Sequence, residues 1–194
     1  MAMTKWRPPV LGLAAVVLAT LPAVAQSGPL AEKLQLCAAC HGEDGNSKME
    51  KIPSLAGQPA FFVLNQLFLM REGVRRIEAM AAIVKDLKDQ DLTDLSEHYA
   101  KLTPKRSDEP IDPELVKRGQ EIAARQRCSS CHLPTLAGQD QMPRVAKQRI
   151  DYLVPTLKSY RDSPRPGADT AMSQPVGSLH DADLTALAHY AASL

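Results

Sequence analysis

An all-α protein built from two similar halves is the fold that the sequence predicts. Apolar residues recur three and four positions apart, as at Leu64, Leu67 and Phe68, which is the spacing of one helix face. No stretch shows the sustained alternation of apolar and polar residues that indicates a β-strand. The motifs of the first half of the chain also return in the same order in the second half.

This spacing predicts helices at about 29–40, 59–72, 91–102, 113–127, 149–161 and 181–193. Pro113 suits the start of a helix, because the N–H group that proline lacks would have no partner there. Asp91 and Asp181 are suitable N-caps for the last helix of each half. Pro155 lies inside the fifth expected helix, so we expect it to kink or restart that helix.

The repeat defines the expected domain organisation. Pro-Ser-Leu-Ala-Gly-Gln at 53–58 returns as Pro-Arg-Val-Ala-Lys-Gln at 143–148, and Met80, Leu87 and Leu92 return as Met172, Leu179 and Leu184. Between the halves, the charged and proline-rich stretch 103–113 cannot continue a helix. We therefore expect one domain at 26–103, a linker at 104–112 and a second domain at 113–194.

The N-terminal segment 1–25 has the layout of a secretory signal peptide. Lys5 and Arg7 precede an apolar run at 10–25, which ends in the small residues Ala-Val-Ala. The alternative is an uncleaved membrane anchor, but the run contains Pro22 and is shorter than the ~20 residues of a spanning helix. We expect cleavage before Gln26 and export to the periplasm, where cysteines can form disulfides.

The four cysteines form two C-x-x-C pairs, and a histidine follows each pair directly. The residues are Cys37, Cys40 and His41 in the first half and Cys128, Cys131 and His132 in the second. C-x-x-C-H is the attachment motif of c-type haem. Thiols three residues apart share one helix face and reach neighbouring vinyl groups of one macrocycle, and the histidine then lies under the iron. The motif predicts two covalently bound haems, one in each half.

Three other interpretations of the cysteines explain less. A zinc site with cysteine ligands only, or two plain disulfides, would leave both histidines without a role. A thioredoxin-like redox site would need a strand–helix–strand setting, which the sequence does not show. Two haems also account for an aromatic content of only 4%, because porphyrins would fill the cores that aromatic rings usually fill.

A low-spin electron carrier needs a sixth iron ligand, most often Met or His. Met80 and Met172 are the methionines that correspond between the halves, and they follow their motif histidines at nearly equal separations along the chain. We expect both in poorly helical stretches that fold back over a haem face. Packing or surface roles are expected for the remaining candidates, which are Met49, Met70, Met142, His98, His180 and His189.

Pro53 and Pro143 also follow the motif histidines at nearly equal separations along the chain. A carbonyl group at each proline could accept a hydrogen bond from the imidazole nitrogen that does not face the iron, and such a bond tunes a metal's potential. A turn-forming role is the alternative.

The sequence resembles the dihaem cytochromes c, and the cytochrome c4 type most closely. The resemblance rests on Cys-Ala-Ala-Cys-His-Gly-Glu-Asp-Gly-Asn-Ser at 37–47, the hexapeptide at 53–58, and the run from Met80 to Leu92 with its duplicate. It implies two class I cytochrome c domains, with haem propionates near a pseudo-twofold interface. It also implies His/Met iron in both domains, with Met80 and Met172 as axial ligands and Pro53 and Pro143 supporting the histidines. The second half departs from the pattern, because Leu133 and Pro134 follow its motif, and it has no counterpart of Gly45 and Asn46, which form the Gly-Asn loop of the first half.

The expected function is single-electron transfer in a respiratory chain. The family implies delivery from a membrane quinol-oxidising complex to a terminal oxidase or reductase. The alternative is a dihaem electron-accepting subunit of a periplasmic dehydrogenase. A catalytic dihaem enzyme is disfavoured, because methionine is available to both irons. A net charge of +1 gives no sign of nucleic-acid binding, and after the signal peptide no apolar run is long enough to span a membrane, so any membrane association is peripheral.

Overall fold

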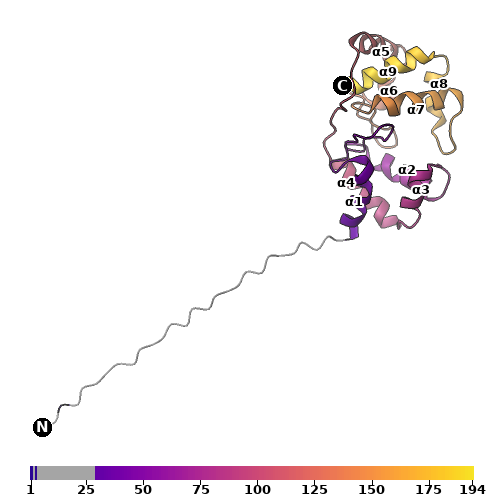
Figure 1. The fold of residues 1–194 in the computed structure, drawn as a ribbon. Coiled ribbons are helices and arrows are strands. Elements are labelled where there is room, and N and C mark those ends of the chain that lie inside the picture. Colours follow the sequence, from indigo (N-terminus) through magenta and orange to yellow (C-terminus); the bar gives the residue numbers. More distant parts are fainter. Residues whose placement is uncertain (2, 4–28) are drawn as a thin grey trace.

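The computed structural model describes residues 1, 3 and 29–194 (Figure 1). The signal peptide expected at 1–25 therefore lies outside the described residues, apart from Met1 and Met3. The described helices form two groups in Figure 1, α1–α4 and α5–α9, with the linker passing along one side. None of the helices at 29–194 has the length and apolar character that crossing a membrane requires.

The first half contains α1 (Pro29–His41), α2 (Ala60–Arg71), α3 (Glu78–Val84) and α4 (Asp89–Lys101). The second half contains α5 (Pro113–Arg125), α6 (Ser129–His132), α7 (Ile150–Asp162), the 3-10 turn η1 (Thr170–Met172), α8 (Ser173–Val176) and α9 (Asp181–Ser193). Residues 29–194 contain no strand and a single isolated bridge, between Gln139 and Met142. The all-α class is confirmed.

All six expected helices are present, and the short elements α3, α6, η1 and α8 were not expected. Met80 lies inside α3, so its placement in a poorly helical stretch is wrong. The two attachment motifs also differ in secondary structure. The first lies on the continuous helix α1, whereas Arg127 adopts a φ of 54° and separates α5 from α6, which carries most of the second.

The expected N-caps were placed too late in both final helices. Lys88 and His180 occupy the N-cap positions of α4 and α9. Asp91 and Asp183 lie three residues later, and their carboxylates accept hydrogen bonds from the backbone N–H groups of Lys88 (2.9 Å) and His180 (3.0 Å). Carboxylates at this third position reach back to the N-cap, as in a capping box. Asp91 is therefore the third residue of its helix and Asp181 is the first residue of α9, so neither is an N-cap.

Pro155 does not restart its helix. α7 is one helix from Ile150 to Asp162 with Pro155 inside it. The hydroxyl of Thr156, directly after the proline, donates to the carbonyl of Tyr152 at 2.7 Å.

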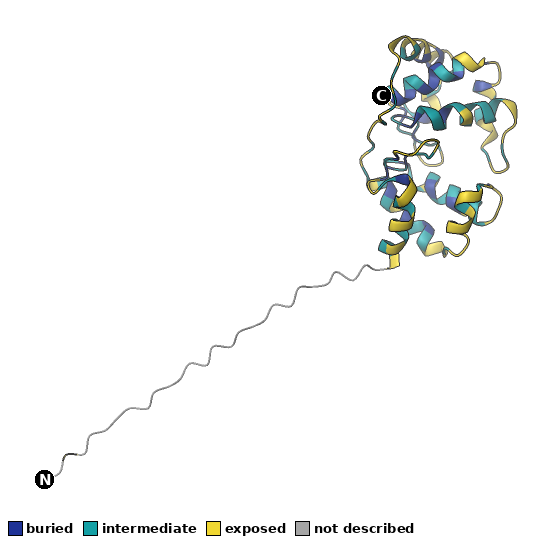
Figure 2. Cartoon of the chain, in the orientation of Figure 1, coloured by how far each residue is buried: buried dark blue, intermediate teal, exposed yellow. Residues whose placement is uncertain are grey.

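Each half packs its helices around its own apolar core, as the buried inward faces in Figure 2 show. In the first half α2 packs against α3 and α4, around Val84, Leu92 and Leu95. In the second half α9 packs against α5 and α7, around Ile122 and Leu184. Both cores lie next to the segment that carries the half's attachment motif, because Cys37 and Cys128 pack against them.

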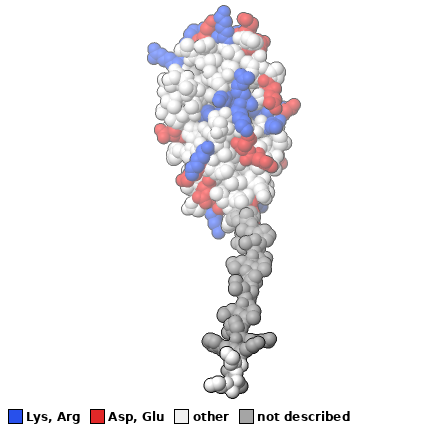
Figure 3. Space-filling model, turned by 90° about the vertical axis from the view of Figure 1, so that its left-hand side faces the viewer, with Lys and Arg blue, Asp and Glu red and all other residues white. Residues whose placement is uncertain are grey.

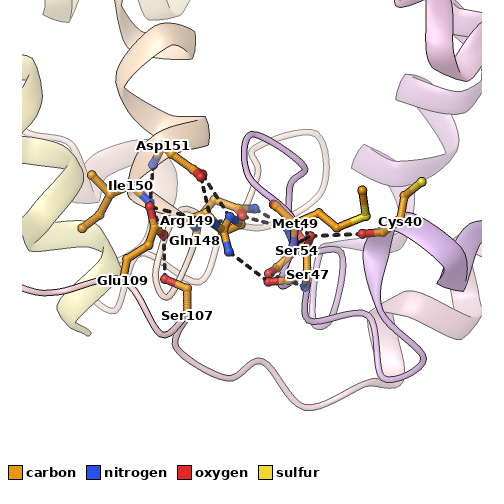
Figure 4. Close-up of polar contacts among 10 residues, drawn as sticks. All are labelled: Cys40, Ser47, Met49, Ser54, Ser107, Glu109, Gln148, Arg149, Ile150 and Asp151. Atoms are coloured by element: carbon orange, nitrogen blue, oxygen red, sulfur yellow. Dashed lines mark hydrogen bonds and ion pairs between the residues drawn. The ribbon is translucent and has the colours of Figure 1, made fainter.

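The linker is held by both halves. The side chain of Asn46 accepts from the N–H of Lys105 at 2.7 Å and donates to the carbonyl of Thr103 at 3.1 Å. The two carboxylate oxygens of Glu109 accept the N–H groups of Ile150 and Asp151, both at 2.9 Å (Figure 4). Glu109 thereby caps the start of α7, where helix N–H groups lack partners. The loop that contains Asn46 thus holds the start of the linker, and Glu109 joins its end to the second half.

Candidate haem site

The cysteines and histidine of each motif lie on one helical turn, Cys37, Cys40 and His41 at the end of α1 and Cys128, Cys131 and His132 at α6. The four thiols are free, with Cys40 and Cys131 exposed and the other two partly buried. Burial raises the pKa of the Cys37 and Cys128 thiols. Among residues 29–194, no three His, Cys, Asp or Glu side chains converge as a metal site would require. The two C-x-x-C pairs therefore do not come together in the way that one zinc site with cysteine ligands would need.

The two motif histidines are buried and held in the same way. The Nδ1 of His41 lies 2.8 Å from the carbonyl oxygen of Pro53, and the Nδ1 of His132 lies 2.8 Å from that of Pro143. Because a carbonyl only accepts, Nδ1 carries the proton and Nε2 keeps a free lone pair. Burial lowers the pKa of both imidazoles, against a smaller opposing effect of the proline carbonyls. Both histidines are thus held neutral, which is the form that binds a metal.

Met80 and Met172 occupy equivalent places in the two halves. Each packs against the apolar core of its own half. The N–H of Met80 donates to the carbonyl of Ile77 at 3.0 Å, and that of Met172 donates to the carbonyl of Asp169 at 3.2 Å. The backbone N–H groups of both methionines thus make the same hydrogen bond to the residue three positions earlier, although Met80 lies in the first turn of α3 and Met172 ends a 3-10 turn.

The other sulfur and imidazole candidates have structural surroundings of their own. Met70 packs in the first core, Met49 is exposed, and Met142 forms the isolated bridge with Gln139. His98 meets Tyr99 edge to face, His180 precedes α9 as its N-cap, and His189 accepts the N–H of Asp112 at 3.2 Å.

The backbone turns in the same left-handed sense after both histidines. Gly42 has a φ of 84° and Leu133 a φ of 69°. A Cβ atom on Gly42 would lie 2.5 Å from the carbonyl oxygen of Asn46, in the Gly-Asn loop. The second half lacks that loop, so a side chain fits at Leu133, although a left-handed backbone remains unfavourable for leucine.

Two glutamines that the sequence analysis did not single out join the halves beside the histidines. Gln148 accepts the N–H of Ser54 at 2.8 Å and donates to its carbonyl at 2.9 Å (Figure 4). Gln58 accepts the N–H of Arg144 at 3.0 Å and donates to its carbonyl at 2.8 Å. Only 4% of Gln58 and 3% of Gln148 is exposed. The available signal was the glutamine that ends both copies of the repeated hexapeptide.

A second contact between the halves passes through Arg149 (Figure 4). Its guanidinium binds both carboxylate oxygens of Asp151, at 2.9 and 2.7 Å, and reaches the carbonyl of Ser47 at 3.4 Å. The hydroxyl of Ser47 in turn donates to the carbonyl of Cys40 at 3.1 Å. This chain of contacts ties the start of α7 to the first attachment motif.

Buried arginine nitrogens without hydrogen-bond partners test whether the residues fit a haem. Among the described residues these atoms are Nε of Arg75, Nε and Nη2 of Arg144, and Nη1 of Arg165. Arg144 is 3% exposed, its Nη1 donates to the carbonyl of Ala146, and burial lowers its pKa to about 10. Arg75 and Arg165 line a cavity of about 290 Å³ together with Lys51 and Tyr152, and these residues come from both halves. Buried cations need anions nearby, and the carboxylates of haem are anions, so the residues present fit the group.

Comparisons with known proteins decide the family. A family model described as cytochrome c matches residues 116–194. The cytochrome c4 of Pseudomonas aeruginosa is 31% identical over 169 residues, which cover 81% of this chain and 83% of that relative. The chain belongs to the cytochrome c4 family. It is therefore an electron-transfer protein with covalently bound haem c, and it is not an enzyme.

The fold agrees with this membership. The crystal structure of reduced recombinant cytochrome c4 from Pseudomonas stutzeri superposes with a TM-score of 0.77 at 30% identity, and the match covers 84% of this chain and 95% of that chain. Another relative is named thiosulfate dehydrogenase electron acceptor, from Thiomonas intermedia. It is 28% identical over 74% of this chain and 68% of its own length. The resemblance to cytochrome c4 and the electron-carrier prediction are confirmed.

Proposed function

We propose that the protein is a periplasmic dihaem carrier in which 26–103 and 113–194 are cytochrome c domains, joined by 104–112, that each bind one haem c. It passes single electrons from a membrane quinol-oxidising complex to a terminal oxidase or reductase. One observation carries the haem count. A C-x-x-C-H motif with a buried histidine, held at 2.8 Å by a proline carbonyl, occurs once in each half.

In this proposal Cys37, Cys40, Cys128 and Cys131 form the thioether bonds to the two haems. His41 and Met80 would ligate one iron, and His132 and Met172 would ligate the other. When bound, each haem supplies an iron that alternates between Fe(III) and Fe(II).

The chain's own residues set the conditions for this exchange. The carbonyls of Pro53 and Pro143 hold the imidazole rings so that Nε2 is directed away from the hydrogen bond. Met80 and Met172 come from apolar surroundings, and a soft sulfur ligand favours Fe(II). If a histidine and a methionine of the protein ligate each iron, as proposed, the iron would exchange electrons without binding a substrate, as in a carrier.

The unpartnered nitrogens of Arg75, Arg144 and Arg165 support a position for the haem carboxylates between the halves. Cations at the carboxylates would offset the charge that the porphyrins bring into a partly buried interface. On the face shown in Figure 3, basic side chains gather near the middle and acidic side chains flank them, so neither sign covers that face.

The location rests on the N-terminal segment 1–25, and we propose cleavage before Gln26 during export. Mass spectrometry of the protein purified from a periplasmic extract tests this. A mass equal to residues 26–194 plus two haems is expected, and retention of the segment 1–25 would contradict it.

The pyridine haemochrome assay, calibrated against the protein concentration, tests the haem count. Two haems per chain are expected, and one or none would overturn the proposal. The ligands are tested with Met80→Ala and Met172→Ala in the oxidised holoprotein. Each variant should lose part of the far-red charge-transfer absorption of Met–Fe(III), and the double variant all of it. Met49→Ala is the control and should leave the band intact.

A dihaem electron-accepting subunit of a periplasmic dehydrogenase is the second candidate function. The relative named thiosulfate dehydrogenase electron acceptor favours it. Purification from the native host under mild conditions distinguishes the two. A catalytic subunit that co-purifies in fixed stoichiometry and reduces the haems when its substrate is added would favour the second function. A protein that purifies alone and is reduced by a quinol-oxidising complex would favour the first.

A further inference from the structure

One peptide group joins each motif histidine to the opposite half of the molecule. The carbonyl of Pro53 and the N–H of Ser54 belong to the same peptide unit. The carbonyl lies 2.8 Å from the Nδ1 of His41, and the N–H donates to Gln148 at 2.8 Å. His41 is in the first half and Gln148 in the second, so a single peptide bond separates the histidine of one half from a side chain of the other.

The second half repeats this arrangement in reverse. The carbonyl of Pro143 lies 2.8 Å from the Nδ1 of His132, and the N–H of Arg144, in the same peptide unit, donates to Gln58 at 3.0 Å. Each glutamine also donates through Nε2 to the next carbonyl, that of Ser54 or Arg144. The amide side chains are thus held at both ends, in a buried interface.

We propose that Gln148 and Gln58 are positioning residues that set the redox potential of the haem in the opposite half. Gln148 acts on the haem that His41 binds, and Gln58 acts on the haem that His132 binds. The inference rests on the proposed axial roles of the two histidines and adds to them a crossed dependence between the halves.

The physical reason is the polarisation of a peptide group that is hydrogen-bonded at both ends. When its N–H donates to the glutamine, its carbonyl oxygen becomes more negative and accepts more strongly from the imidazole N–H. A stronger bond at Nδ1 makes the imidazole a more basic ligand, which stabilises Fe(III) and lowers the potential. Loss of the glutamine should therefore raise the potential of the opposite haem.

The amide oxygens of Gln148 and Gln58 accept different numbers of hydrogen bonds. The Oε1 atom of Gln148 also accepts the backbone N–H of Arg149 at 3.0 Å, whereas within residues 29–194 the Oε1 atom of Gln58 accepts from Arg144 alone. An oxygen shared between two donors polarises each of them less. Removal of Gln58 should thus have the larger effect.

The test compares the holoprotein variants Gln148→Leu and Gln58→Leu, in which an apolar side chain of similar size replaces the amide. Potentials are read for each haem from its assigned methyl resonances during a redox titration. Gln148→Leu should raise the potential of the His41 haem by about threefold in the Fe(III)/Fe(II) equilibrium, or ~28 mV at ~59 mV per tenfold change. The His132 haem should stay within a quarter of that shift. Gln58→Leu should give the reverse assignment, with at least the same magnitude.

A second readout follows the hydrogen bond itself. In the reduced, diamagnetic protein the Nδ1–H resonance of His41 should move upfield in Gln148→Leu, with that of His132 unchanged, and the converse should hold in Gln58→Leu. A purely structural role for the glutamines would loosen the interface and shift both haems and both resonances together. Equal shifts, shifts of the haem in the same half, or no shift would overturn the inference.

Gln148→Asn and Gln58→Asn keep the inference testable if the leucine variants do not fold. They retain a polar amide but are one methylene shorter, so the potential must rise at the same opposite haem, and an unchanged potential there overturns the crossed dependence. The proposed function fails separately, if the wild-type protein lacks two haems or the Met–Fe(III) band. A protein with both features but without crossed shifts refutes this inference alone.

Discussion

Gly119 of α5 lies directly against the backbone carbonyl of Ala186 in α9. A Cβ atom at Gly119 would overlap the Ala186 carbonyl group, with the carbonyl carbon at 2.6 Å, and would approach the Cβ of Tyr190 to 2.7 Å. Because the colliding atoms include backbone, the helices would have to separate. This crossing closes the core of the second half.

Gly119→Ala should therefore destabilise the second half. The expected loss is about 1–3 kcal/mol in the free energy of unfolding, because overpacking at a close contact forces backbone shifts. Urea unfolding of the holoprotein measures it. Glu121→Ala, at an exposed position of the same helix, is the control and should change stability by less than about 0.5 kcal/mol. A tolerated alanine at 119 would contradict the close crossing.

Leu133 and Leu136 allow the cost of a left-handed backbone to be compared at a partly exposed and a buried leucine. Both have left-handed backbones, with φ of 69° and 52°, but only Leu136 is buried. Leu133→Gly should raise stability by about 1 kcal/mol, because it relieves the left-handed strain at little cost in packing. Leu136→Gly should lower it by about 2 kcal/mol or more, since lost burial outweighs the same relief. Thermal unfolding of the two variants checks the opposite signs.

Arg144→Leu tests the proposed contact with a haem carboxylate. Removing a buried positive charge near a haem should stabilise Fe(III), so the potential of at least one haem should fall. Arg125→Leu, at an exposed position of α5, should leave both potentials unchanged. Potentiometric titration of both variants measures the shifts. Potentials that do not move in Arg144→Leu would show that this arginine has no carboxylate partner on the haem.

Asp44 should report the contact between the linker and the Gly-Asn loop. Lys105 donates to its carboxylate at 2.6 Å, and this bond, with the N–H of Asn46, lowers the pKa of Asp44 to about 2. Because the folded pKa is lowered, the carboxylate stabilises the fold above pH ~3.9, and this contribution disappears as pH falls through 2. NMR titration should find a pKa near 2 in the wild type and a higher value in Lys105→Met. Lys101→Met, on the exposed end of α4, should leave it unchanged.

Removal of a haem should unfold the half that binds it. The chain is 4% aromatic, and domains of this size are marginal without a large prosthetic group. In the Cys37→Ala/Cys40→Ala variant, lacking the first haem, backbone amides at 29–101 should lose their protection from hydrogen exchange. Amides at 113–193 should keep theirs, and Cys128→Ala/Cys131→Ala should show the converse. Full protection of a half that has lost its haem would contradict this account of the composition.

The sequence predicted the long helices well, because their apolar spacing and proline starts are local signals. It missed α3, although Met80 lies within it, because so short a helix gives no periodic pattern that stands out. The N-caps were misplaced by a few residues for a related reason. Aspartate is suited both to the N-cap and to the third position of a helix, and only the backbone hydrogen bond to Lys88 or His180 separates the two.

Some residues of the candidate site could likewise be identified from the sequence, and others could not. The attachment motifs, their histidines and the paired methionines could be found from spacing and repetition alone. The repeat marks Gln58 and Gln148 as corresponding residues, but it gives no sign of the residue in the other half that each glutamine contacts.

Local sequence is enough to establish that the protein is helical, that it is a duplication, and that each copy carries a haem-attachment motif, because these features are written in residues a few positions apart. Which side chains from one copy reach the other is settled by the packing of the two halves. Gln148 meets Ser54 across 94 positions of sequence, Gln58 meets Arg144 across 86, and α5 meets α9 at Gly119. Such contacts depend on how completed helices and halves are placed against each other. No local pattern of helix or turn encodes that placement.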